Sequence, residues 1–153
     1  MLGCQQLNPR TGDAYAGLIV YGAYNREYLQ IELTEQLKAG QTYYLEFFVS
    51  PIDQCSGSSG FTDAIGMGFS DTLVVKDIPN NSNNPINPKV IAFENLGTIL
   101  SNTGTWTKLS HCYTARGDES VVIIGNFRTD DETGFATNNS QGILQNYLFI
   151  DDV

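Results

Sequence analysis

The sequence predicts an all-β protein folded as an antiparallel β-sandwich. Short runs rich in β-branched and aromatic residues recur along its 153 residues, and polar loops rich in Gly, Ser and Asn separate them. No segment shows the apolar spacing of an amphipathic helix. A chain of this length can bury a substantial core in one unit. We therefore expect a single domain, spanning residues 1–153, in which two antiparallel sheets pack face to face.

Eight strands are expected, at residues 14–21, 26–33, 42–49, 62–70, 90–93, 104–115, 121–127 and 147–153. The run at 42–49 (TYYLEFFV) is the strongest, and Pro51 ends it. Two glycines within 62–70 predict a bulge or a close approach of another backbone. Between the strands we expect a helical turn at 34–37, a long exposed loop at 77–88, a hairpin turn at 116–119 and a polar loop at 129–141.

The last seven residues, Tyr147 to Val153 (YLFIDDV), are the clearest strand signature of the chain. Alternation places Tyr147, Phe149 and Asp151 on one face of this strand, and aliphatic residues on the other. A strand this apolar belongs in a core. The acidic pair at its end therefore requires a turn, a cation or water beside it.

The charge balance excludes two classes of partner. Asp and Glu number 17 against 8 Lys and Arg, which gives a net charge of −9. Nucleic acids and anionic membranes are bound by basic surfaces, so we expect neither as a partner. No run of about 18 apolar residues is present, so we expect no membrane span. Only 16% of the residues are charged and uncharged polar residues predominate, which is common in extracellular β-proteins.

Three widely spaced cysteines, Cys4, Cys55 and Cys112, leave one unpaired within the chain. In an exported protein, one disulfide is expected, and both Cys4–Cys112 and Cys55–Cys112 are possible pairings. The only histidine, His111, adjoins Cys112, but a strand places the two side chains on opposite faces. They therefore form no nucleophile–base pair, and a zinc site lacks ligands. We expect a core thiol at Cys112 and a surface imidazole at His111.

Five parts of the chain together resemble one family. They are residues 3–5 with 9–18 (PRTGDAYAGL), 26–29 with 37–40 and 43–47 (YYLEF), 63–66 with 69–70, 106–115 with 123–127 (IIGNF), and 147–153. This combination resembles the jelly-roll domain of secreted and outer-membrane proteins of Bacteroidetes-type bacteria. That domain often precedes an OmpA-like peptidoglycan-binding domain or a gliding-motility-type sorting domain. The sandwich is also similar to galactose-binding-like carbohydrate-binding modules, which tend to finish on an aromatic–Ile-Asp-Asp-Val strand.

The resemblance implies a galactose-binding-domain-like jelly roll, secreted or held in the cell envelope. Its implied function is to bind a polysaccharide or cell-wall glycan without catalysis. Family members usually begin with further upstream strands, which this chain lacks, so we expect a fragment of a longer protein with an open sheet edge. In related modules the upstream strand supplies calcium ligands, which puts a complete metal site in doubt here.

The candidate ligand-binding residues combine aromatic rings that stack on sugars with amide and carboxylate groups that hold hydroxyls. They are Tyr24, Tyr28, Gln30, Glu32 and Trp106, and alternation puts Tyr28, Gln30 and Glu32 on one strand face. The alternative is ordinary packing. Tyrosines pair across half-exposed sheets, and Trp106 on a central strand would belong to the core.

The candidate ligands of a structural calcium ion are Asp63, Asp151 and Asp152, because calcium takes six to eight oxygen ligands. The alternative for Asp151 and Asp152 is a capped strand end whose carboxylates accept backbone N–H bonds. We expect no enzyme, because the sequence contains no nucleophile elbow, phosphate loop or zinc-protease motif. A second functional hypothesis is a structural spacer, or an adhesion module of an envelope protein that binds other envelope proteins and no small ligand.

Overall fold

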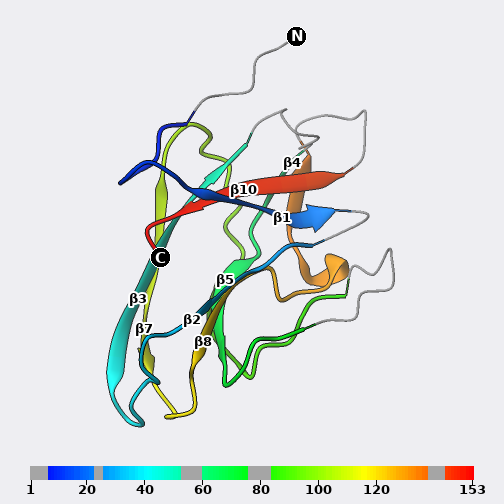
Figure 1. The fold of residues 1–153 in the computed structure, drawn as a ribbon. Coiled ribbons are helices and arrows are strands. Elements are labelled where there is room, and N and C mark those ends of the chain that lie inside the picture. Colours follow the sequence, from blue (N-terminus) through cyan, green and yellow to red (C-terminus); the bar gives the residue numbers. More distant parts are fainter. Residues whose placement is uncertain (1–6, 23–25, 53–59, 76–83, 138–143) are drawn as a thin grey trace.

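The computed structural model describes residues 7–22, 26–52, 60–75, 84–137 and 144–153 (Figure 1). These ranges contain one 3-10 turn, η1 (Asp130–Glu132), and ten strands. The strands are β1 (Ala16–Gly22), β2 (Leu29–Glu32), β3 (Thr42–Pro51), β4 (Gly60–Thr62), β5 (Ile65–Ser70), β6 (Val90–Asn95), β7 (Thr107–Thr114), β8 (Val121–Gly125), β9 (Phe135–Thr137) and β10 (Gln145–Asp151).

The strands form two four-stranded antiparallel sheets and a small ribbon. Sheet A has the order β1-β10-β3-β7, sheet B has the order β2-β8-β5-β6, and β4 pairs with β9. Along the chain, strands of sheets A and B alternate except at β5 and β6, which are neighbours in sheet B. This wrapping of one chain between two layers is a jelly roll, and it confirms the predicted all-β antiparallel sandwich.

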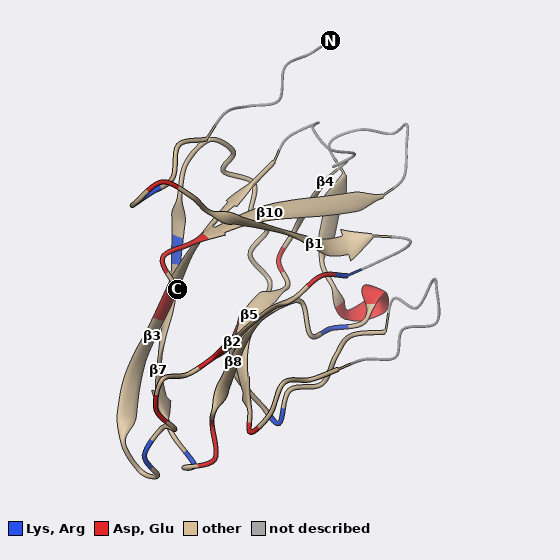
Figure 2. Cartoon of the chain, viewed as in Figure 1, with Lys and Arg blue, Asp and Glu red and all other residues tan. Residues whose placement is uncertain are grey.

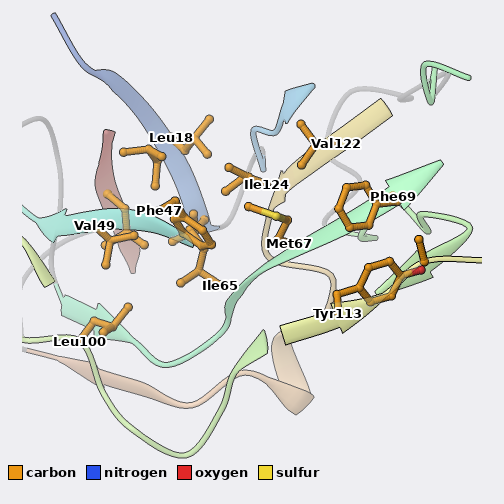
Figure 3. Close-up of a cluster of buried hydrophobic side chains, with 14 residues drawn as sticks. Leu18, Phe47, Val49, Ile65, Met67, Phe69, Leu100, Tyr113, Val122 and Ile124 are labelled. Atoms are coloured by element: carbon orange, nitrogen blue, oxygen red, sulfur yellow. The ribbon is translucent and has the colours of Figure 1, made fainter. Parts of the chain in front are cut away.

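The core lies between the inner faces of the two sheets (Figure 3). Phe47 and Val49 enter it from β3, and Met67 and Phe69 from β5; each is at most 3% exposed. The alternation predicted for the closing strand is also observed, because Leu148 and Ile150 are buried while the alternating Tyr147 and Phe149 are half-buried. Each such fully buried side chain contributes roughly 1.5–3 kcal/mol to stability.

A second apolar cluster covers part of the outer face of sheet B. Val121 and Ile123 alternate with the core residues of β8, and Ile86 and Phe127 pack against them. Strand β8 is therefore buried on both faces, which explains why its sequence, VVIIG, has no polar alternation.

The turn between β7 and β8 differs from its prediction. Residues 116–119 do not close a hairpin, because β7 belongs to sheet A and β8 to sheet B. The chain crosses from one layer to the other here. The residues expected to form a helical turn, 34–37, are not helical either. Instead the N–H of Leu37 donates to the carbonyl of Glu119 (3.0 Å), which ties that segment to the crossing.

The crossing is built around the carboxylate of Glu119, which is 1% exposed. It accepts the N–H groups of Arg116 (2.7 Å), Gly117 (2.7 Å) and Asp118 (3.0 Å), and the hydroxyl of Tyr113 (2.5 Å). Burial alone would raise the pKa of this carboxyl, but the hydrogen bonds outweigh burial and lower the pKa to about 2. A buried carboxylate thus organises the turn.

The strand predicted at 62–70 is divided in the structure. It breaks at Asp63 into β4 and β5, and only β5 belongs to sheet B. The prediction from its glycines is confirmed, because the register with β6 shifts between Met67 and Gly68. A Cβ atom at Gly66 would overlap the carbonyl oxygen of Phe93, so the two backbones approach closely. Within the loop predicted at 129–141, the structure places η1 and β9.

Candidate functional site

The binding face predicted on β2 is covered by another segment. The Gln30 amide makes two hydrogen bonds with the backbone of Val74, donating to its carbonyl (2.9 Å) and accepting its N–H (2.8 Å). The Tyr28 hydroxyl donates to the carbonyl of Asn126 (2.8 Å) and accepts the N–H of Ile86 (3.2 Å). Burial raises the pKa of Tyr28. Tyr28 and Gln30 therefore anchor the two ends of the β5–β6 connection.

The other predicted ligand residues do not gather at this face. Glu32 is exposed at the end of β2, in the same sheet as Gln30. Trp106 immediately precedes β7 and so belongs to the opposite layer of the sandwich. Tyr24 lies outside the described residues. The structure thus places Gln30 and Glu32 on β2 and Tyr28 directly before it, and it separates Trp106 from them.

Trp106 instead joins three aromatic residues on the outer face of sheet A. Tyr147 meets Phe149 edge-on with ring centroids 5.9 Å apart, and Phe149 meets Tyr15 at 4.5 Å. Tyr15 in turn meets Trp106 at 5.7 Å, again edge-on. All four side chains are half-buried. We call these four residues the aromatic strip.

Strand register explains why the strip forms. Phe149 pairs with Gly17 on one side and with Ser50 on the other, and Trp106 extends this row beyond Ser50. The two small residues leave space for neighbouring rings, and a Cβ atom at Gly17 would overlap the ring of Tyr147. The indole N–H of Trp106 donates to the carbonyl of Asn8 (3.1 Å). Of these four strip residues, sequence reasoning selected only Trp106 as a ligand residue, although alternation had already placed Tyr147 and Phe149 on one face.

The acidic pair at the end of β10 binds the segment before β1. The carboxylate of Asp151 accepts the N–H of Arg10 (2.7 Å) and that of Asp152 (2.8 Å). Asp152 accepts the hydroxyl of Thr11 and forms an ion pair with Arg10, and these two contacts lower the pKa of Asp152. With φ at 49°, Asp152 turns the chain in the left-handed conformation that Asp tolerates better than most residues. These are the contacts of a capped strand end.

Asp63 joins two loops. Its carboxylate accepts the N–H of Gly97 (2.8 Å) and that of Gly134 (2.8 Å), and its carbonyl accepts the side-chain amide of Asn95 (2.7 Å). Among the described residues, no three Asp, Glu, His or Cys side chains group as a metal site requires. Asp63 therefore does not lie with the acidic pair of β10. A structural calcium ion at these residues stays a prediction.

Replacing Asp63 with Ala is expected to lower the free energy of unfolding by about 2 kcal/mol in buffer containing a calcium chelator, because two loop N–H groups lose a charged acceptor. Urea denaturation measures this, with the exposed Asp131→Ala as the matched control, for which we expect a change within about 0.5 kcal/mol. A cost that appears only when calcium is added would instead identify Asp63 as a metal ligand.

The described cysteine is also placed differently from its prediction. Cys112 is exposed on the outer face of β7, not in the core, and it forms no disulfide within the described residues. Cys4 and Cys55 lie outside them. His111 points to the opposite face, as expected, and its ring stacks on Phe93 with centroids 5.6 Å apart. The two side chains therefore make no joint site.

An apolar cleft opens between the sheets beside β3. It has a volume of about 320 Å³, and its lining includes Ile31, Leu33, Leu45, Met67, Phe69 and Val122. Ligand pockets in proteins commonly span about 300–1,000 Å³. We call this hollow the inter-sheet cleft. No sequence pattern indicated it, because its residues come from four separate strands, from the segment after β2 and from Val153, which follows β10.

Comparison with protein families, curated proteins and solved structures found no match to this chain. Within the described residues, no helix has the length and apolar character needed to cross a membrane. The strand arrangement alone shows the fold.

Proposed function

We propose that the protein is a non-catalytic module of a secreted or cell-envelope protein and that it binds glycan on the aromatic strip. The observation that carries this proposal is the unbroken contact of four aromatic rings across the outer face of sheet A. Sugar rings present C–H faces that pack on aromatic side chains, and neighbouring polar groups hold their hydroxyls.

Polar groups suited to sugar hydroxyls flank the strip. The segment before β1 lies beside it, because the carbonyl of Asn8 accepts the indole N–H of Trp106. The same segment is fixed at Arg10 and Thr11 by the carboxylates that end β10. These bonds hold the strip's border in one conformation, which reduces the entropy lost when a ligand binds.

Intrinsic fluorescence offers a direct test, because Trp106 is the only tryptophan of the chain. We expect soluble cell-wall and plant polysaccharides that retard the protein in affinity gels also to change its fluorescence saturably. The variant Trp106→Ala should weaken retardation about tenfold or more, since a buried aromatic contact contributes more than about 1.4 kcal/mol. Its thermal unfolding is measured alongside to show that it remains folded.

The matched control is Tyr44→Ala. Tyr44 lies on the same face of sheet A, away from the strip, and its side chain is 58% exposed. This variant should bind polysaccharide as the unmodified protein does. Retardation without a change in Trp106 fluorescence would move the glycan site elsewhere, and a folded protein that ignores every polysaccharide would remove the function. The alternative class, a protein-interaction module, is favoured by a different surface, the inter-sheet cleft.

A further inference from the structure

The lower half of β3 is an open sheet edge. Strand β7 pairs with β3 along Thr42 to Val49, whereas β10 pairs only with Phe48 to Pro51. Figure 1 shows β10 crossing the upper part of β3 and leaving its lower part uncovered on that side. Within the described residues, Thr42 to Phe47 therefore have a strand neighbour on one side only. Such an edge is a template for another strand.

The bonds at the two ends of β3 show which backbone groups face the opening. On the β10 side, the N–H of Ile52 donates to the carbonyl of Tyr147 (3.1 Å). On the β7 side, the carbonyl of Gln41 accepts the N–H of Ala115 (2.9 Å). Backbone groups alternate in direction along a strand. Odd-numbered residues therefore bond to β7, and the N–H and C=O groups of Thr42, Tyr44 and Glu46 face the open edge.

The inter-sheet cleft adjoins this edge. Ile31 of β2 lines it and is 45% exposed, and Val122 of β8 lies beneath the opening. Both belong to the face of sheet B that elsewhere is covered by sheet A. One more strand beside β3 would extend sheet A across this gap, with every second side chain directed into the cleft.

The charges around the opening select the partner. Acidic residues lie on β3 and at the end of β2 (Figure 2), but only the one on β3 lines the cleft. Glu46 lines the cleft, and Lys108 lies 3.5 Å from its carboxylate, whereas Glu32 pairs with Val121 and faces the outer side of sheet B. Two copies of a chain with net charge −9 repel each other, so pairing of two copies along this edge is unfavourable. A basic partner is attracted instead.

We propose that the β3 edge and the inter-sheet cleft bind an extended segment of another protein, in which apolar residues alternate with Lys or Arg. The segment adds to sheet A as a strand beside Thr42 to Phe47. Its backbone bonds to Tyr44 and Glu46, its apolar side chains fill the cleft, and its basic side chains lie on the outer face of sheet A beside Glu46. This surface is separate from the aromatic strip, so the two proposals stand or fall independently.

The probe is a panel of capped nine-residue peptides with Val, Ile, Leu or Phe at odd positions and Lys or Thr at even positions. Fluorescence anisotropy measures binding to the intact protein. Amide hydrogen exchange, followed by NMR, should slow about tenfold at Tyr44 and Glu46 when the peptide saturates the protein. The amides of Tyr43 and Leu45, which already bond to β7, should change much less.

Two further comparisons define the site. Placing Pro at the central position of the best peptide removes a backbone donor, and we expect binding to weaken about tenfold or more. The protein variant Ile31→Ser should weaken binding about tenfold, since it removes one apolar contact in the cleft. Ile91→Ser is the matched control, because Ile91 is similarly exposed, at 41%, but lies on β6 at the other edge of sheet B.

Several results would overturn this proposal. One is that no peptide of the panel slows exchange at Tyr44 and Glu46. Another is equal binding by Ile31→Ser and by the unmodified protein. A third concerns the protein without peptide. If these amides became more protected as the protein concentration increased, and sedimentation showed a rising mass, the edge would bind a second copy of the chain. Preference for Glu over Lys in the peptides would exclude the charge argument.

Discussion

Replacing Glu119 with Ala is expected to lower the free energy of unfolding by about 3–5 kcal/mol. The substitution leaves the N–H groups of Arg116 and Gly117 and the hydroxyl of Tyr113 without their acceptor. Each buried donor left unpaired costs about 1–3 kcal/mol. The loss also loosens the crossing from sheet A to sheet B, on which the packing of both layers depends. Urea denaturation at neutral pH measures the effect.

Two variants calibrate this result. Glu119→Gln keeps one acceptor oxygen, so its cost should lie between that of Ala and zero. Glu35→Ala removes an exposed carboxylate from the segment before β3, and we expect a change within about 0.5 kcal/mol. If Glu119→Ala cost no more than Glu35→Ala, the buried carboxylate would not organise the turn.

The same carboxyl predicts how stability changes with pH. Its pKa is about 2 in the folded protein, compared with an ordinary value of 4.5. Because the folded pKa is depressed, the stabilisation is complete above about pH 4.5 and is lost as pH falls toward 2, and it amounts to about 3 kcal/mol. In Glu119→Gln this part of the acid dependence should be missing. A profile as steep as that of the unmodified protein would contradict the assignment.

Tyr113 acts at the opposite end of the pH scale. Burial, together with its hydrogen bond to Glu119, raises the pKa of its hydroxyl to about 12 from an ordinary 10.0. The unfolded chain therefore releases this proton first, and stability should fall as pH rises from about 10 to 12. Tyr113→Phe should remove that loss, which a stability profile between pH 9 and 12 would show.

Strand positions could be predicted from the sequence because alternation is a local property. Leu148 and Ile150 face the core and Phe149 faces outward, as their spacing indicated. The role of Glu119 was not predictable in this way. A charged residue in a turn usually faces water, and this one is buried only because β7 and β8 lie in different sheets. Sheet assignment is a long-range property that local spacing does not contain.

The candidate sites show the same limit. Gln30 and Glu32 do share β2, and Tyr28 directly precedes it, but Gln30 is bonded to a backbone 44 positions away and Tyr28 to one 58 positions away. A covering segment without a distinctive side chain leaves no signal in the sequence. The aromatic strip likewise depends on the register that sets Phe149 between Gly17 and Ser50.

Replacing Phe47 with Ala is expected to lower the free energy of unfolding by about 3–5 kcal/mol. Its side chain is 0% exposed and reaches across the core to Phe93, with ring centroids 5.8 Å apart. Both sheets surround the position (Figure 3), so the cavity cannot close without moving a strand. Thermal or urea unfolding measures the loss.

The adjacent Phe48 is the matched control, because it is the same residue on the opposite face of β3. It is covered by the guanidinium of Arg10, 3.6 Å from its ring centroid, rather than by a second sheet. A flexible side chain can follow the smaller residue, so Phe48→Ala should cost only about 1–2 kcal/mol. A one-residue slip in the register of β3 would exchange the two faces. If Phe48→Ala cost more than Phe47→Ala, the two faces of β3 would therefore be exchanged. The aromatic strip and the backbone groups assigned to the open edge would then both be wrong.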